Sequence, residues 1–109
     1  MLDADNIFLI GPMGSGKSAV GRQLAERLGL EFVDSDAEIE SRTGVDIPYI
    51  FEREGEDGFR AREREVLDLL TRRERVLVAT GGGAILDAGT RERLRSRGCV
   101  VYLRTSVGQ

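Results

Sequence analysis

The chain has 109 residues, a formal net charge of −3 and one cysteine. Its length allows one domain at most, and its acidic balance argues against nonspecific nucleic-acid binding, which needs a basic field. No apolar run approaches the ~18 residues of a membrane span and no segment resembles a signal peptide, so we expect a cytoplasmic protein without a membrane partner.

The chain opens with a predicted strand and an amphipathic helix. The apolar run Asn6–Ile10 is followed at once by a glycine, which predicts a short strand buried on both faces. Over residues 16–28 an apolar side chain recurs every four positions, which predicts a helix with one stripe facing the core. That stripe consists of Val20, Leu24 and Leu28.

The next segment predicts a second strand and then helices separated by glycines. Residues 31–33 form a brief strand, and Ser35 followed by Glu38 has the pattern of a capping box that opens a short helix. Another helix begins near Asp46, and Gly55 and Gly58 are expected to break the chain before a longer helix over residues 59–71. Its core-facing positions are Phe59, Glu63, Val66, Leu67 and Leu70.

Two further strands complete an α/β pattern with a parallel sheet. Val76–Ala79 predicts a third buried strand, a helix follows over residues 87–97, and Cys99–Leu103 predicts a fourth strand, with Cys99 as a buried structural thiol. An apolar strand needs cover on both faces, yet only six residues follow the fourth strand. We therefore expect the chain, 1–109, to be a carboxyl-terminally incomplete single domain.

Between the first strand and the first helix lies Gly11–Ser18, with the spacing G-x-x-x-x-G-K-S of a phosphate-binding loop. Glycines in such a loop let backbone N–H groups curl around a phosphate, and the following helix points its positive end at it. Lys17 is the only lysine among 16 basic residues, and its compact ammonium differs from the planar fork of arginine. The sequence therefore predicts a nucleoside triphosphate site.

Two other stretches are expected at the same edge of the sheet, beyond the carboxyl ends of the strands. Asp34 and Asp36 follow the second strand, where one carboxylate can face Mg²⁺ waters and the other a substrate hydroxyl; alternatively, Asp34 and Ser35 only cap the next helix. The triplet Gly81–Gly83 follows the third strand and suggests close approach of a ligand to the backbone. Arg60 and Glu63 are spaced either for a site or for a simple i,i+3 ion pair.

The stretches G-P-M-G-S-G-K-S, F-V-D-S-D, G-F-R-A-R-E and A-T-G-G-G, in this order and spacing, resemble the shikimate kinase family over residues 6–103. The resemblance implies the three-layer sandwich of P-loop kinases. It implies a transferase that moves the γ-phosphoryl of ATP to the 3-hydroxyl of shikimate, in the pathway to chorismate and the aromatic amino acids. Its partners would be ATP, Mg²⁺ and shikimate, and a monomer is expected.

The resemblance also implies roles for individual residues. Asp36 would hold the shikimate hydroxyls and help to accept the proton of the attacking one, and Lys17 would act with it in catalysis. Ser18 would ligate Mg²⁺ directly and Asp34 through water. The residues expected to bind the nucleotide are Gly14, Ser15, Gly16, Lys17, Ser18 and Ala19, of which Ala19 replaces a threonine found in many members.

The substrate-binding segment implied by the resemblance is 35–64. Within it Arg60 would bind the shikimate carboxylate and Glu63 would orient Arg60, because an anionic carboxylate suits a guanidinium fork. Gly82 would donate a backbone N–H to the substrate. The residues expected to line the substrate pocket are Ile47, Phe51 and Phe59.

Other functions remain open on the residues alone. A non-catalytic nucleotide-binding module fits the phosphate loop, and so does a P-loop kinase for another small hydroxy acid such as gluconate. A GTPase is disfavoured because the Asn-Lys-x-Asp motif for guanine is missing: Asn6 and Lys17 are the only residues of their types. A dinucleotide fold is disfavoured because its glycine fingerprint should start directly after the strand.

We predict that these 109 residues alone bind phosphate but are nearly inactive. The family's lid with its transition-state arginine, a second carboxylate-binding arginine, the adenine-clasping loop and a fifth strand would all lie beyond Gln109. An arginine of that kind is worth ~10³ or more in rate. A coupled assay of ADP release should show almost no turnover, and turnover near the usual ~1–100 s⁻¹ of kinases would contradict this prediction.

Overall fold

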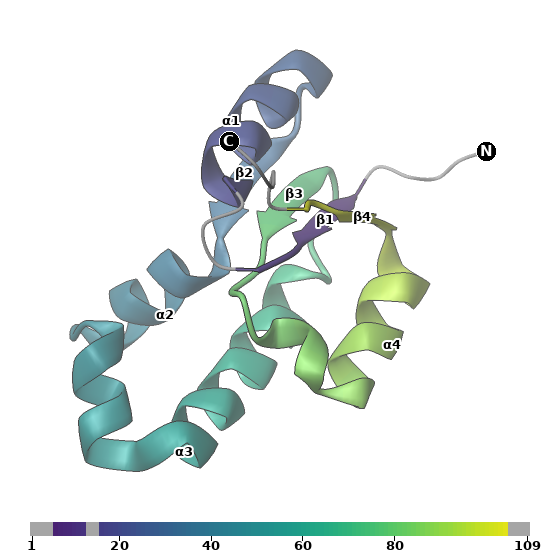
Figure 1. The fold of residues 1–109 in the computed structure, drawn as a ribbon. Helices are drawn as coiled ribbons and strands as arrows, with labels where there is room; N and C mark the ends of the chain where they lie inside the picture. The colour runs from purple at the N-terminus through teal and green to yellow at the C-terminus, as the bar shows by residue number, and fades with distance from the viewer. Residues whose placement is uncertain (1–5, 13–15, 105–109) are drawn as a thin grey trace.

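The computed structural model describes residues 6–12 and 16–104, and over these residues the chain builds a parallel four-stranded sheet in the order β2-β3-β1-β4 (Figure 1). The strands are β1 (Ile7–Ile10), β2 (Glu31–Asp34), β3 (Val76–Ala79) and β4 (Cys99–Tyr102). All three pairings are parallel, so the predicted α/β class and parallel sheet are confirmed.

Helices cover both faces of this sheet and make three layers (Figure 1). They are α1 (Lys17–Leu28), α2 (Ser35–Thr43), α3 (Ile47–Leu70) and α4 (Ala88–Arg97), with a short 3₁₀ turn η1 (Ala84–Leu86) before α4. None of the helices in the described part of the chain is long and apolar enough to cross a membrane.

The strands alternate their side chains between two cores, as the period of a strand requires. Phe8, Val76 and Val78 pack into the larger core, together with residues of α3 and α4. Leu9 and Leu77 pack into the smaller core on the side of α1. The buried strands β1 and β3 therefore lie between two apolar layers, as expected for a parallel sheet.

The predicted core stripe of α1 is wrong for two of its three residues, since only Leu24 packs against the smaller core. Val20 and Leu28 are 41% and 47% exposed, and the buried residues of the helix are Gly21 and Ala25. A Cβ on Gly21 would lie 2.7 Å from Cε1 of Phe32. The helix approaches the sheet so closely that only small side chains fit between them, and the larger apolar ones are displaced to the flanks.

Helix α3 bends once, at Gly55, whose φ of 74° and ψ of 178° lie outside the helical region. The second predicted break, Gly58, is wrong because the helix continues through it. Figure 1 shows the first part of α3 running away beside α2 and the second part returning to the sheet. The apolar face predicted for the second part is buried, and Glu63 lies on it. The bend therefore separates a projecting segment from a core helix.

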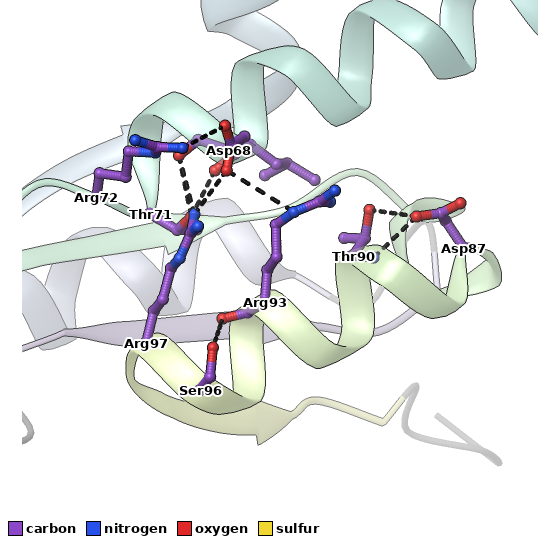
Figure 2. Close-up of polar contacts among 9 residues, drawn as sticks. Asp68, Thr71, Arg72, Asp87, Thr90, Arg93, Ser96 and Arg97 are labelled. Carbon is purple, nitrogen blue, oxygen red and sulfur yellow. Dashed lines mark hydrogen bonds and ion pairs between the residues drawn. The ribbon is translucent and has the colours of Figure 1, made fainter.

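A polar cluster fastens α4 to the end of α3 (Figure 2). Nη1 of Arg97 donates to Oδ1 of Asp68 at 2.8 Å and to Oγ1 of Thr71 at 2.9 Å. The hydrogen bond from Arg97 is the main cause that holds the pKa of Asp68 below its usual value. Asp87 caps α4 by accepting from the backbone N–H of Thr90 at 2.8 Å.

The fourth strand pairs with β1 alone among the described strands, so it forms an edge. Cys99 is exposed there, and its prediction as a buried thiol is wrong. The apolar character of the strand was correctly identified, but an edge position leaves Cys99 and Tyr102 open to solvent.

Candidate active site

The ends of β1, β2 and β3 meet around a cavity of about 240 Å³. Parallel strands bring their carboxyl ends to one edge of a sheet, so the three stretches singled out in the sequence become neighbours. The cavity is lined by Gly16, Lys17, Ser18, Ala19, Asp34, Asp36, Thr80, Gly81 and Gly82.

The phosphate-loop side of the cavity is formed by the start of α1. Gly14 and Ser15, two of the predicted phosphate-binding residues, lie outside the described residues. Gly16 has a φ of 85°, a left-handed conformation that favours glycine. Nζ of Lys17 donates to the carbonyls of Gly11 at 2.7 Å and Pro12 at 2.9 Å. These carbonyls hold the ammonium at the mouth of the loop.

Burial lowers the pKa of Lys17, while the neighbouring carboxylates of Asp36 and Asp34 act in the opposite direction. A lysine surrounded in this way is suited to receive a polyanion, because the full negative charge of the anion attracts the ammonium more strongly than the carbonyl dipoles do.

Asp34 serves two purposes at the tip of β2. Its Oδ1 accepts from the backbone N–H groups of Asp36 at 3.0 Å and Ala37 at 3.1 Å, so Asp34 is the cap of α2. Its Oδ2 accepts from Oγ of Ser18 at 2.5 Å. The interpretation of Asp34 as a helix cap is therefore confirmed, while its role toward Mg²⁺ through water stays a prediction.

Ser35 is not the cap that the sequence pattern predicted. It is fully buried inside α2, and its Oγ accepts from the backbone N–H of Gly81 at 3.1 Å. The reason is geometric: Asp34 already satisfies the free N–H groups of the helix, and Ser35 faces the end of β3. This bond ties the start of α2 to the turn after β3. It has no signal in the sequence, because serine near a helix start suggests a cap.

The Asp36 carboxyl lines the cavity and is only partly solvated. Burial is the main cause that raises its pKa to about 6, with further contributions from the negative charges of Asp34 and Glu63. Its Oδ1 is buried and has no hydrogen-bond partner within the described part of the protein. The hydrogen-bonding capacity of this oxygen is therefore not met by the described residues.

Arg60 and Glu63 line a second cavity of about 220 Å³ on the other side of the glycine triplet. Nη1 of Arg60 donates to Oε1 of Glu63 at 2.9 Å. The Glu63 side chain is only 4% exposed, and burial raises its pKa although the hydrogen bond to Arg60 opposes the shift. Oε2 of Glu63 has no partner among the residues described.

Of the three predicted pocket-lining residues, Phe59 lies beside Arg60, whose Cζ is 5.3 Å from the centre of its ring. The rings of Phe51 and Phe59 stack with centroids 4.8 Å apart, and Ile47 packs against the larger core. Neither of the two cavities is lined by them. Their assignment to a substrate pocket stays a prediction.

Oxygen donors for Mg²⁺ are present in the first cavity. The Ser18 hydroxyl and the Asp34 carboxylate are in hydrogen-bond contact, and oxygen ligands suit this hard cation. Residues 6–12 and 16–104 contain no group of three or more His, Cys, Asp or Glu that could hold a metal. Mg²⁺ bound with phosphates typically uses only one or two protein ligands and water, so the donor pair fits it.

Comparison with known proteins gives consistent results. A sequence model described as shikimate kinase matches residues 13–109. A shikimate kinase of Halorhodospira halophila is 65% identical over 101 residues, which cover 93% of this chain and 57% of that protein. The chain spans about three fifths of the length of the curated relatives that it matches.

Solved structures give the same result for the fold. The shikimate kinase of Acinetobacter baumannii in complex with shikimate matches with a TM-score of 0.93 and 61% identity, over 96% of this chain and 59% of that one. A gluconokinase of Sinorhizobium meliloti matches with a TM-score of 0.53 and 25% identity, over 91% of this chain and 55% of that one.

The raised pKa of Asp36 predicts a pH-dependent gain in stability when the charge is removed. In the folded state this carboxyl binds its proton up to about pH 6, whereas an unfolded aspartate releases it near 3.8, so stability falls as the pH rises between these values. We expect Asp36→Asn to raise the free energy of unfolding by about 1 to 2 kcal/mol above pH 6, after allowance for solvent screening, and by little below pH 4.

Urea unfolding between pH 4 and pH 8 measures this effect. Asp57→Asn, on an exposed aspartate, is the matched control and should change stability by less than about 0.5 kcal/mol at every pH. A gain for Asp36→Asn that does not grow with pH would contradict the assigned burial of this charge.

Proposed function

The chain belongs to the shikimate kinase family, and on that premise we propose that it carries the nucleotide and acceptor sites of an ATP-dependent shikimate kinase. The reaction moves the γ-phosphoryl of ATP to the 3-hydroxyl of shikimate: the new bond joins that oxygen to phosphorus, and the bond to the β-phosphate oxygen breaks. The observation that carries the proposal is that Lys17, Ser18, Asp34 and Asp36 line one cavity.

The phosphates would lie at the start of α1, the positive end of that helix. Lys17, held by the carbonyls of the loop, would transfer its contacts to the β- and γ-phosphates. Ser18 and Asp34 would hold Mg²⁺, Ser18 directly and Asp34 through water. When bound, the ion neutralises charge on the transferring phosphoryl group.

Asp36 would receive the acceptor hydroxyl. Its Oδ1 has no hydrogen-bond partner among residues 6–12 and 16–104, and a pKa of about 6 leaves the carboxylate ionised near neutral pH yet able to take up a proton. The proton that leaves the 3-hydroxyl would pass to this carboxylate as the phosphoryl group arrives.

Arg60 would bind the carboxylate of shikimate, and Gly82 would donate its N–H to the substrate. Glu63 keeps the guanidinium in place through the 2.9 Å hydrogen bond, so Arg60 is oriented before the substrate arrives. The segment 35–64 would therefore supply most of the substrate contacts, with ATP and shikimate as the two partners of the protein.

A kinase for gluconate or another hydroxy acid is the alternative of the same class. It has weaker support, because the gluconokinase match is more distant in both fold and sequence than the shikimate kinases. ADP release by the full-length protein with shikimate, compared with gluconate, tests the two. Release with neither acceptor would favour a nucleotide-binding module without catalysis.

We expect Lys17→Met in the full-length protein to lower kcat/KM by ~10²-fold or more, through loss of a preorganised charge at the transferring phosphoryl group. A coupled assay of ADP release with saturating shikimate measures it. The control is Arg27→Met, which removes a cation from the exposed last turn of the same helix and should leave the rate unchanged. Unchanged activity of Lys17→Met would contradict the assignment of Lys17 to the β- and γ-phosphates.

Arg60→Ala should raise the KM for shikimate and leave the KM for ATP unchanged, since the guanidinium lies in the second cavity, away from the phosphate loop. The matched control is Arg62→Ala, two residues further along the same helix. It removes an exposed arginine that pairs with Glu54, and it should change neither KM. An equal rise in both KM values for Arg60→Ala would contradict the placement of Arg60 at the shikimate carboxylate.

A further inference from the structure

The glycine triplet that follows β3 is in close contact with charged side chains of the chain itself. A Cβ added to Gly83 would lie 2.6 Å from Nη1 and 2.7 Å from Cζ of Arg60, and it would also collide with Nη2. Real Cβ atoms essentially never come this close to another heavy atom. The plane of the Arg60 guanidinium therefore lies directly against the Gly83 backbone.

The backbone of Gly83 does not itself require glycine. Its φ of −99° and ψ of 6° are accessible to any L-residue. The absence of a side chain at this position is therefore explained by the space that the guanidinium occupies.

Arg60 has little freedom to move aside. Nη1 is bound to Oε1 of Glu63 at 2.9 Å, Nε lies 3.6 Å from Oε2 of Glu56, and Cζ lies 5.3 Å from the centre of the Phe59 ring. A shift of the guanidinium away from Gly83 would weaken its bond to Glu63 and leave a buried carboxylate unpaired, which is costly.

Gly81 shows the same arrangement with the opposite charge. A Cβ there would lie 2.7 Å from Oδ1 of Asp36 and 2.9 Å from Oε2 of Glu63, the two buried oxygens without a hydrogen-bond partner in the described part of the chain. The Ser35 hydroxyl holds the N–H of Gly81 and so fixes the distance between the triplet and these acids. The triplet thus has acidic groups at its first glycine and a basic group at its third.

We infer that Gly83 is a positioning residue for substrate binding: its missing side chain sets the place of the Arg60 guanidinium, and through it the affinity for the substrate carboxylate. This inference rests on the proposed function, in which Arg60 binds that carboxylate. Gly83 acts through Arg60, whereas Gly82 is the glycine assigned to the substrate itself.

Gly83→Ala in the full-length protein tests the inference. We expect the KM for shikimate to rise about tenfold or more, because guanidinium–carboxylate pairs depend on geometry, while the KM for ATP stays the same. Gly89→Ala in α4 is the control: its nearest heavy atom would be Oδ2 of Asp87 at 3.3 Å, and alanine favours a helix, so neither KM should change. An unchanged KM for shikimate in Gly83→Ala would overturn the inference.

A double-mutant cycle separates positioning from general damage. In the Arg60→Ala background the guanidinium is absent, so adding Gly83→Ala should cause no further rise in the KM for shikimate. The double variant should also unfold at the same urea concentration as Arg60→Ala, which keeps the test valid even when Gly83→Ala alone folds poorly. Equal losses from Gly83→Ala in both backgrounds would overturn the inference.

The same double-mutant cycle, measured by urea unfolding, also distinguishes the inference from the proposed function. A wild-type protein with no shikimate-dependent ADP release would refute the proposed function. If the effects of the two substitutions on the unfolding midpoint were then not additive, the packing of Arg60 against Gly83 would still be supported. Additive effects would overturn this packing as well.

Discussion

Parallel pairing of β1, β2 and β3 is the constraint on which the site depends. The register places Leu9 and Asp34 beside the same residue of β3, Ala79, so the loops that follow all leave the sheet at one level. Thr80 reinforces this, because both its backbone N–H and its hydroxyl donate to the carbonyl of Leu9, at 3.0 and 2.9 Å. A phosphate loop, an acidic turn and a glycine turn are thereby brought to one cavity, where side-chain hydrogen bonds of Ser18 with Asp34 and of Ser35 with Gly81 join them.

The charges at this edge are arranged at the expense of stability. Asp36 and Glu63 each have a buried oxygen that finds no hydrogen-bond partner in the part of the chain that the structure describes, and burial raises the pKa of both. Folded proteins rarely keep such groups unless function needs them. The compensating structure lies elsewhere, in the apolar layers around β1 and β3 and in the Asp68 cluster that joins α4 to α3 (Figure 2).

Much of the fold could be predicted from periodicity and glycines, since strand and helix patterns are local. The close packing of α1 could not, because the space left by Gly21 depends on Phe32 in the next strand. Cys99 was mispredicted because an apolar strand is equally compatible with the middle and the edge of a sheet. For the site, the sequence indicated Lys17, Asp34 and Asp36, and the structure brings them to one cavity. The partner of Ser35 and the contacts of Gly83 depend on three-dimensional proximity and have no local sequence signal.

The central claim is that Asp36 presents the acceptor hydroxyl to a phosphoryl group held by Lys17. A crystal structure of the full-length protein with ADP, Mg²⁺ and shikimate tests it most directly. We predict a shikimate hydroxyl within about 2.6 to 3.2 Å of an Asp36 carboxylate oxygen, in the cavity that also contains the Lys17 ammonium. Shikimate bound away from that cavity, or an Asp36 side chain turned out of it, would contradict the account.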